Sequence, residues 1–239
     1  MTISLPTKQV LGILADNLNR RGSVLPLSRS RSVGWSEGLG IPRGGKTILY
    51  TGLMYQLMPS MIALSRVLYR LEDSPLVRLF GLGRVLNRYL NGSRLVPLLV
   101  SRRDQEAFDG ILRNVALLLR GAGVDFGYLY DQEVYAGALA HDEGLCDTFR
   151  THAERVHHLF RRNGVERVIT VDPHTTNVLR SVYPRILGEN GVDVMSYLEV
   201  LAEADTRSSE KGMGTGEPPD RPVVIHDSCV YARHEDMLE

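Results

Sequence analysis

The amino-acid sequence predicts an α/β protein, in which a doubly wound, mainly parallel sheet carries helices on both faces. Two observations lead to this prediction. Residues 47–51 and 168–171 are short apolar runs with the length of buried strands. Stretches of helical period lie between such runs, and this alternation is typical of βαβ units. With 239 residues, 43% of them hydrophobic, the chain is long enough for one large domain, or one domain and part of a second.

The same patterns assign the elements in chain order. The expected strands are 47–51, 124–129, 168–171, 192–194 and 222–226. The expected helices are 7–20, 59–71, 107–120, 147–162, 175–182 and 196–202, and residues 75–100 are also assigned as helical. Pro59 suits the first turn of its helix, and Tyr183-Pro184 is expected to end the helix before it. The buried face of the helix at 107–120 is predicted to consist of Ile111, Val115, Leu118 and Leu119.

Composition shifts divide the chain into four parts. Residues 1–46 form a lead-in helix and extended segment, which Trp35 is expected to fix to the body. Residues 47–206 form the α/β domain. Residues 207–221 are rich in Gly and Pro and are predicted to be an exposed linker or loop. Residues 222–239 form a further C-terminal segment, which begins with the expected strand at 222–226.

Charge and cysteine content exclude several classes of protein. The formal net charge is zero, so no generic attraction to nucleic acid is expected. Two cysteines in a chain of this length argue against a disulfide-stapled secreted fold. No apolar run approaches the roughly 20 residues of a transmembrane helix, and the N-terminus lacks the pattern of a signal peptide. The expected location is the cytoplasm.

Residues 40–47 match the phosphate-loop pattern GxxxxGK[ST], but their context differs from that of a nucleotide site. A phosphate loop follows a strand and opens a helix, so that backbone N–H groups surround the phosphates. Here no strand-like segment precedes the loop, and a strand-like segment follows it. We therefore interpret residues 40–47 as a turn that enters the first strand.

In a parallel sheet, ligands bind beyond the carboxyl ends of the strands, and several chemically capable residues lie at such ends. Asp131 and Glu133 form an acidic pair there, which alone is weak evidence for acid–base chemistry. The other candidates follow the strands at 168–171 and 222–226, and they are Asp172, His174, His226, Asp227 and Cys229. These residue types suit zinc or ferrous iron if the two strands are neighbours. The simpler interpretation is that Asp172 caps the helix that follows and His174 lies on the surface.

Three segments resemble the motifs of one protein family, in the same order along the chain. They are Ile48–Gln56 (ILYTGLMYQ), Glu133–Gly137 (EVYAG) and Asp172–Thr175 (DPHT). They are similar to the cysteine after a strand, the CCG tripeptide and the C-x-x-C of the cysteine-rich (CCG) domain. This domain occurs in heterodisulfide reductase subunits and related iron–sulfur proteins. A fourth segment, Val223–Arg233 with HDSC inside it, resembles the start of the family's second copy.

The departures from the family pattern concern the cluster ligands. The first-copy positions where the family has cysteines are occupied here by Leu53, Tyr135, Ala136, Asp172 and Thr175. Iron–sulfur clusters require several thiolates, which these side chains do not provide. Only Cys229, in the second and truncated copy, matches a family ligand. The resemblance therefore implies a degenerate first copy and a cluster that this chain does not hold alone.

By resemblance, the chain belongs to a heterodisulfide-reductase-like redox system that passes electrons to a disulfide, quinone or flavin partner. The implied cofactor is an iron–sulfur cluster of the [4Fe–4S] type, with Cys229 as one ligand and His226 and Asp227 beside it. The implied partners are a ferredoxin-like or flavoprotein redox subunit and a chain that supplies the missing cysteines. Two alternatives stay open. One is a cofactor-free interaction or scaffold subunit, and the other is a mononuclear-metal enzyme that uses Asp172, His174 and His226.

Overall fold

A three-stranded parallel sheet organises the described part of the chain. The computed structural model describes residues 7–71, 98–188, 191–210 and 228–234. The strands β1 (Thr47–Tyr50), β2 (Arg167–Thr170) and β3 (Asp193–Ser196) lie side by side in this order. Thr47 pairs with Arg167, and Arg167 pairs with Asp193, so the carboxyl ends of all three strands meet at one edge. These strands confirm the parallel α/β prediction.

Apolar residues point to both faces of the sheet, as expected for strands covered on two sides. On one face Ile48 and Tyr50 of β1 and Val168 of β2 join a core with helices α1 (Thr7–Arg21) and α7 (Cys146–Arg162). Tyr50 meets Phe160 of α7 edge to face, with 5.1 Å between ring centroids. Helices therefore cover this face, as the sequence predicted.

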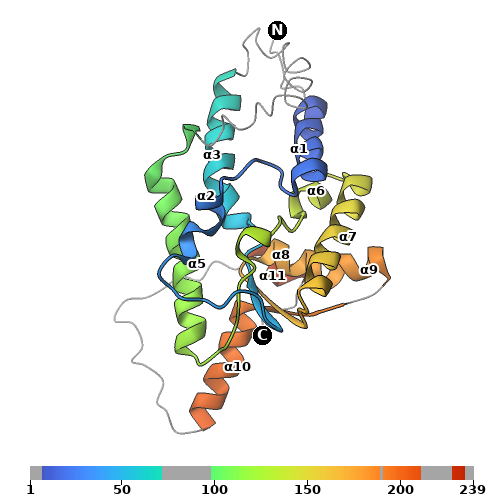
Figure 1. Ribbon diagram of the computed structural model, residues 1–239. Helices are drawn as coiled ribbons and strands as arrows, with labels where there is room; N and C mark the ends of the chain where they lie inside the picture. Colours follow the sequence, from blue (N-terminus) through green and yellow to red (C-terminus); the bar gives the residue numbers. More distant parts are fainter. Residues whose placement is uncertain (1–6, 72–97, 189–190, 211–227, 235–239) are drawn as a thin grey trace.

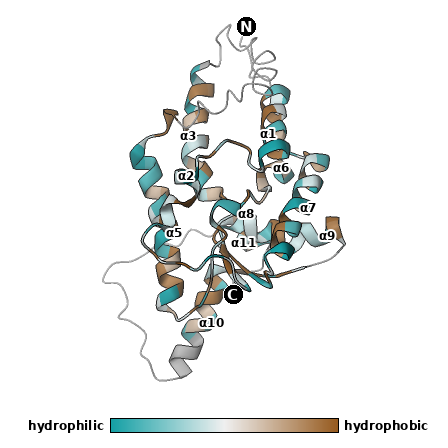
Figure 2. Cartoon of the chain, viewed as in Figure 1, coloured by the Kyte–Doolittle hydropathy of each residue, from teal (hydrophilic) through white to brown (hydrophobic). Residues whose placement is uncertain are grey.

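The opposite face of the sheet carries a second core. Leu49 of β1 and Ile169 of β2 pack there with residues of α5 (Arg102–Gly121) and α10 (Tyr197–Glu210). Helix α3 (Met54–Leu71) runs beside α5 in Figure 1. In Figure 2, α5 and α7 carry hydrophobic and hydrophilic residues in alternation along their length, the pattern of helices with one buried face.

Trp35 anchors the lead-in to this second core. The lead-in contains α1, then α2 (Arg29–Val33) and a 3₁₀ turn (Gly34–Ser36). Trp35 is fully buried, and its Nε1 donates a hydrogen bond to Tyr128 Oη at 3.2 Å. The expected role of Trp35 is confirmed. The lead-in then enters β1 through residues 40–47, so the order of elements at the phosphate-loop pattern is the reverse of a nucleotide site.

The predicted strand at 124–129 is wrong in extent. Only Gly127 and Tyr128 form isolated parallel bridges, to Ile48 and Arg43. Gly127 N donates to Thr47 O at 2.9 Å, while Tyr128 N donates to Pro42 O at 2.9 Å. The lead-in thus occupies the outer side of this segment. A Cβ at Gly127 would lie 1.6 Å from Gly44 O, so only glycine permits this close approach.

Both proline-based helix boundaries are wrong. Pro59 lies inside α3, which begins at Met54 because Gly52 and Leu53 adopt positive φ values of 56° and 55° and turn the chain directly from β1 into the helix. Pro184 does not end the second helix. Helix α8 (Pro173–Asn177) continues through a π-helical turn (Val178–Val182) into α9 (Tyr183–Leu187). The wider π turn accommodates a residue that has no N–H to donate.

The buried face of α5 also differs from the prediction. The structure buries Leu112, Val115, Ala116 and Leu119. Ile111 and Leu118 remain 39% and 56% exposed. The helix is therefore rotated by a fraction of a turn relative to the predicted face, because α3, the sheet and Trp35 contact its other side.

The C-terminal part is described only in pieces. Helix α10 extends to Glu210, so the first residues of the expected 207–221 linker are helical. The expected strand at 222–226 and the helical assignment at 75–100 lie outside the described residues, except for the last residues of the latter. Helix α11 (Cys229–His234) contacts α8. Among the described helices, none is both long enough and apolar enough to cross a membrane.

Candidate functional site

Loops from distant parts of the sequence meet at the carboxyl edge of the sheet. A Cβ at Gly52, just after β1, would lie 2.6 Å from Thr175 Oγ1 and 3.0 Å from Ala136 Cβ. Ala136 N also donates a hydrogen bond to Gly52 O at 3.2 Å. The three segments that resemble the cysteine-rich domain therefore converge at one point, although they are spread over more than 120 residues (52 to 175).

The side chains at this point form a packed interior. Leu53, Tyr135, Ala136, Asp172 and Thr175 are all buried. Tyr135 Oη accepts a hydrogen bond from Leu139 N at 2.9 Å, and Ala136 O accepts one from Tyr183 Oη at 2.8 Å. None of the five side chains is a thiol, and the close contact at Gly52 shows that the loops already touch. An iron–sulfur cluster does not fit these five residues.

Glu133 holds the β1–α3 turn in place. Its Oε1 accepts hydrogen bonds from Thr51 N at 2.6 Å, Thr51 Oγ1 at 3.0 Å and Gly52 N at 3.0 Å. Its Oε2 is buried and makes no hydrogen bond of ordinary geometry within the described residues, but the Tyr128 phenol lies close enough to lower the pKa of the carboxyl. Burial raises the pKa of Glu133 to about 7, against the opposing effect of the hydrogen bonds that the carboxylate accepts. In the sequence Glu133 is visible only as half of an acidic pair and as the first residue of the segment Glu133–Gly137, because its partner Thr51 is distant in the chain.

Asp172 acts as the N-cap of α8. Its Oδ1 accepts a hydrogen bond from Thr175 N at 2.9 Å, and Pro173 occupies the first turn. The capping interpretation of Asp172 is therefore confirmed. Its Oδ2 is buried without a hydrogen-bond partner among the described residues, and burial raises the pKa of this carboxyl above its usual value.

Two tyrosines, Tyr55 and Tyr231, lie close enough to Asp172 for its charge to raise their pKa values. Tyr231 of α11 shares a hydrogen bond of 2.8 Å with Ser196 Oγ at the end of β3. Burial, followed by the negative charge of Asp172, raises the pKa of Tyr55 to about 12. The phenol groups therefore stay protonated at neutral pH and serve as hydrogen-bonding groups at this edge.

The other predicted site residues are only partly brought together. His174 lies on α8, about half exposed, with its Nδ1 3.4 Å from Asp142 Oδ2. Cys229 is the first residue of α11 and is exposed, as is the other free cysteine, Cys146. His226 lies outside the described residues. Within the described ranges, no group of three or more His, Cys, Asp or Glu side chains is arranged to hold a metal ion.

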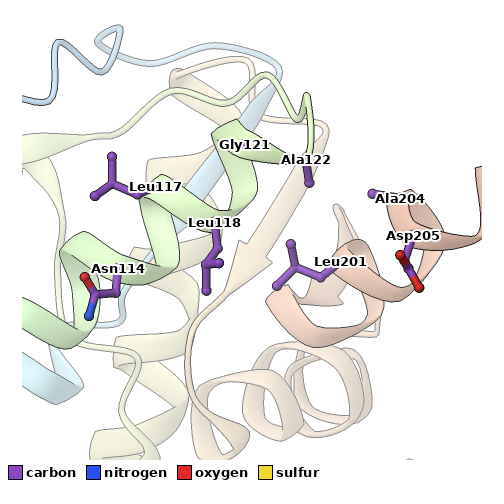
Figure 3. A pocket seen from close by; sticks show the side chains of 8 residues that line it. All are labelled: Asn114, Leu117, Leu118, Gly121, Ala122, Leu201, Ala204 and Asp205. Carbon is purple, nitrogen blue, oxygen red and sulfur yellow. The ribbon is translucent and has the colours of Figure 1, made fainter. Parts of the chain in front are cut away.

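A separate apolar groove of about 780 Å³ lies between α5 and α10. Figure 3 shows Leu117 and Leu118 of α5 on one side and Leu201 of α10 on the other. Leu117 and Leu118 are about half exposed. Leu118, which the sequence predicted to be buried, lines this groove, and the groove shares no lining residue with the carboxyl edge.

Comparison with known proteins gives partial and distant relatives. The chain is 31% identical over 122 residues to the EtfAB:quinone oxidoreductase of Syntrophomonas wolfei, a match that covers 51% of this chain and 16% of the relative. It is 31% identical over 124 residues to the probable iron-sulfur-binding oxidoreductase FadF of Bacillus subtilis, covering 52% and 17%. A probable membrane-anchored ferredoxin of Chromohalobacter salexigens is 27% identical over 130 residues, covering 54% and 19%.

The chain spans less than a fifth of the length of these curated relatives. No family model matches the chain, and no solved structure matches it. The names of these relatives agree with a resemblance to iron–sulfur proteins. The chain is thus distantly related, over about half of its length, to iron–sulfur-binding oxidoreductases.

Proposed function

We propose that the chain is part of a heterodisulfide-reductase-like iron–sulfur redox system, in which its α/β domain is a degenerate cysteine-rich domain. The observation that supports this proposal is the convergence of Gly52, Ala136 and Thr175, since it brings the family's three ligand segments to one point. The names of the relatives support the redox class. The domain then contributes a packed scaffold, and the electron path to a disulfide, quinone or flavin partner runs outside it.

Cys229 is the proposed cluster ligand of this chain. It is exposed at the start of α11, and α11 lies against α8, whose N-cap Asp172 belongs to the degenerate site. Residues 222–239 are accordingly proposed as the start of a second cysteine-rich unit. The further thiolates come from a partner chain or a second copy, and a ferredoxin-like or flavoprotein subunit exchanges electrons with the cluster. The proposed compartment is the cytoplasm.

Anaerobic reconstitution tests this proposal. The full chain is incubated with ferrous iron, sulfide and 2-mercaptoethanol, which supplies the missing thiolates. Iron and acid-labile sulfide are then measured together with visible charge-transfer absorbance. We expect a cluster in the wild type and in Cys146→Ser, and none in Cys229→Ser. The two exposed cysteines make a matched pair, because neither substitution removes a buried side chain. The assignment of Cys229 is overturned if Cys229→Ser contains as much cluster as the wild type. It is also overturned if no variant binds a cluster, and that second result favours the cofactor-free scaffold.

A mononuclear metal site at Asp172, His174 and His226 is a second candidate. The observation that favours it is the buried Oδ2 of Asp172, which has no partner among the described residues. Zinc or iron bound without sulfide, and lost in both Asp172→Asn and His174→Ala, would support it. Asparagine retains the helix cap, so loss of metal in that variant is not explained by unfolding. Metal content that these substitutions leave unchanged rejects the site.

A further inference from the structure

An exposed apolar surface follows the groove between α5 and α10. On α5 it consists of Ile111, Leu117 and Leu118, each between 39% and 56% exposed. On α10 Leu201 lines the groove, and Leu198, one turn earlier on the same side of the helix, is exposed. Single exposed leucines are normal on a protein surface, but apolar side chains gathered along a groove of about 780 Å³ are typical of a surface that another chain covers.

The two ends of this surface differ in shape. Gly121 and Ala122 at the end of α5 lie across the groove from Ala204 of α10, and these residues have little or no side chain (Figure 3). Ile111, which is bulky, lies ten residues before Gly121 on the same helix and so marks the other end. A second copy turned by 180° brings the bulky end onto the open end at both places. A two-fold contact has this property, because every pair of contacting residues in it occurs twice.

Helix α5 has the residue spacing that such a contact requires. Exposed residues follow one another at alternating intervals of three and four, and they are Ile111, Asn114, Leu118 and Gly121. This spacing keeps side chains on one side of a helix and is typical of helices that pack along their length. If two α5 helices lie antiparallel about an axis beside Leu117, Ile111 of each copy meets Gly121 of the other. Each α5 then lies in the groove of the other copy, and the four helices form a bundle.

The charges at the two ends of the surface are opposite as well. Arg103 is exposed near the start of α5, whereas Asp125, just after α5, and Asp205 of α10 are exposed at the other end. Arg120 also lies at that end, but its guanidinium donates a hydrogen bond to the carbonyl of Leu39. In the antiparallel arrangement, the start of α5 in one copy extends past the small residues of the other and brings Arg103 towards the two aspartates. A parallel arrangement would instead bring like charges together, so the charges favour the antiparallel one.

We propose that this groove is the interface of a homodimer, in which the α5 helices of two copies pack antiparallel about a two-fold axis. Leu117 and Leu118 of the two copies meet at its centre, and Arg103 of each copy faces the exposed aspartates of the other. The interface includes neither Cys229 nor a cluster, so it goes beyond the redox proposal. The observation that carries it is that the two ends of one groove match each other in both shape and charge.

Sedimentation equilibrium of the full chain, without iron or sulfide, measures the oligomeric state. We expect a dimer with a Kd below about 10 µM. Leu117→Glu places a charge at the centre of the interface and is expected to weaken the dimer at least about 100-fold. Because Leu117 is about half exposed, the fold is retained, and circular dichroism checks this. Tyr69→Glu is the matched control, since Tyr69 is an exposed apolar residue of α3 that does not line the groove, and this variant should dimerise like the wild type.

Two charge reversals test the antiparallel geometry. Arg103→Asp and Asp125→Arg each bring like charges together in their own dimers, and at low salt each is expected to dimerise about tenfold more weakly than the wild type. A mixture of the two variants restores opposite charges at both ends, so native mass spectrometry should show the mixed dimer in excess over both homodimers.

Three results would overturn the proposal. They are a wild type that is monomeric at about 100 µM, equal behaviour of Leu117→Glu and Tyr69→Glu, and a mixed dimer no more abundant than random pairing gives. A monomeric chain that binds a cluster contradicts this proposal alone, and a dimeric chain without a cluster contradicts only the redox proposal.

Discussion

Glu133 and Thr51 are 82 residues apart in sequence, and a single carboxylate oxygen of Glu133 accepts from both the amide and the hydroxyl of Thr51. This pair ties the end of β1 to the loop that precedes α6 (Ala138–Asp142). It also fixes the backbone at which the three family-like segments meet.

The first prediction concerns pH. Burial raises the pKa of Glu133 to about 7, from an ordinary value of 4.5, so the native state retains a proton that the unfolded chain releases. The contribution of Glu133 to the free energy of unfolding is therefore largest below about pH 4.5, and it is lost as the pH rises to about 7. The expected loss is on the order of 3 kcal/mol. Urea unfolding of the wild type and Glu133→Gln between pH 4.5 and 8 measures it.

Glutamine keeps an acceptor for Thr51 and does not titrate, so the pH-dependent difference between the two proteins isolates Glu133. Asp131→Asn, at an exposed neighbouring position, serves as the control and should retain the wild-type slope in this window. Parallel pH profiles for the wild type and Glu133→Gln would show that Glu133 is not the titrating group.

The second prediction concerns the convergence point. Gly52→Ala places a Cβ 2.6 Å from Thr175 Oγ1 at a φ of 56°, so we expect a loss of about 1–3 kcal/mol in the free energy of unfolding. Gly110→Ala, inside α5 and with no atom within 4 Å of the added Cβ, should instead stabilise by about 0.5–1 kcal/mol. Chemical denaturation of both variants checks the pair, and a neutral Gly52→Ala would contradict the close approach.

The third prediction concerns the cap of α8. Asp172→Ala removes the hydrogen bond from Thr175 N and should cost about 1 kcal/mol, while Asp172→Asn retains most of the stability. Asp147→Ala, in the first turn of α7 but with no capping hydrogen bond, should cost only a few tenths of a kcal/mol. Thermal unfolding ranks the three. Equal losses in Asp172→Ala and Asp147→Ala would mean that the cap contributes nothing beyond its charge.

The fourth prediction concerns the orientation of α5. Leu119 is fully buried, and Leu119→Ala should cost about 2–5 kcal/mol. The preceding residue, Leu118, lines the groove between α5 and α10 and is 56% exposed. Leu118→Ala should therefore change the free energy of unfolding by no more than about 0.5 kcal/mol. The sequence alone assigned both to the buried face. Urea titrations of the two variants therefore decide between the two orientations of α5. A similar loss of stability for both substitutions would support the buried face that the sequence predicted.

Much of the local structure was predictable from sequence. The prediction agrees to within one residue at each end for the strands β1 and β2 and the helices α1 and α7. Each of these elements has a strong hydrophobic period and residues at its ends that are typical of strand or helix boundaries. The boundaries based on Pro59 and Pro184 failed, because positive φ at Leu53 and a π turn before Pro184 are not visible in composition.

The sequence by itself determined the parallel α/β class, the capping role open to Asp172 and the absence of cysteines at Leu53, Tyr135 and Ala136, since these depend on residue type and local order. Only the tertiary structure decided which side of α5 is buried, that Gly52 touches Thr175, and that Glu133 is held inside the protein against Thr51. The physical reason is that burial and pKa depend on contacts between residues far apart in the chain, which no local pattern encodes.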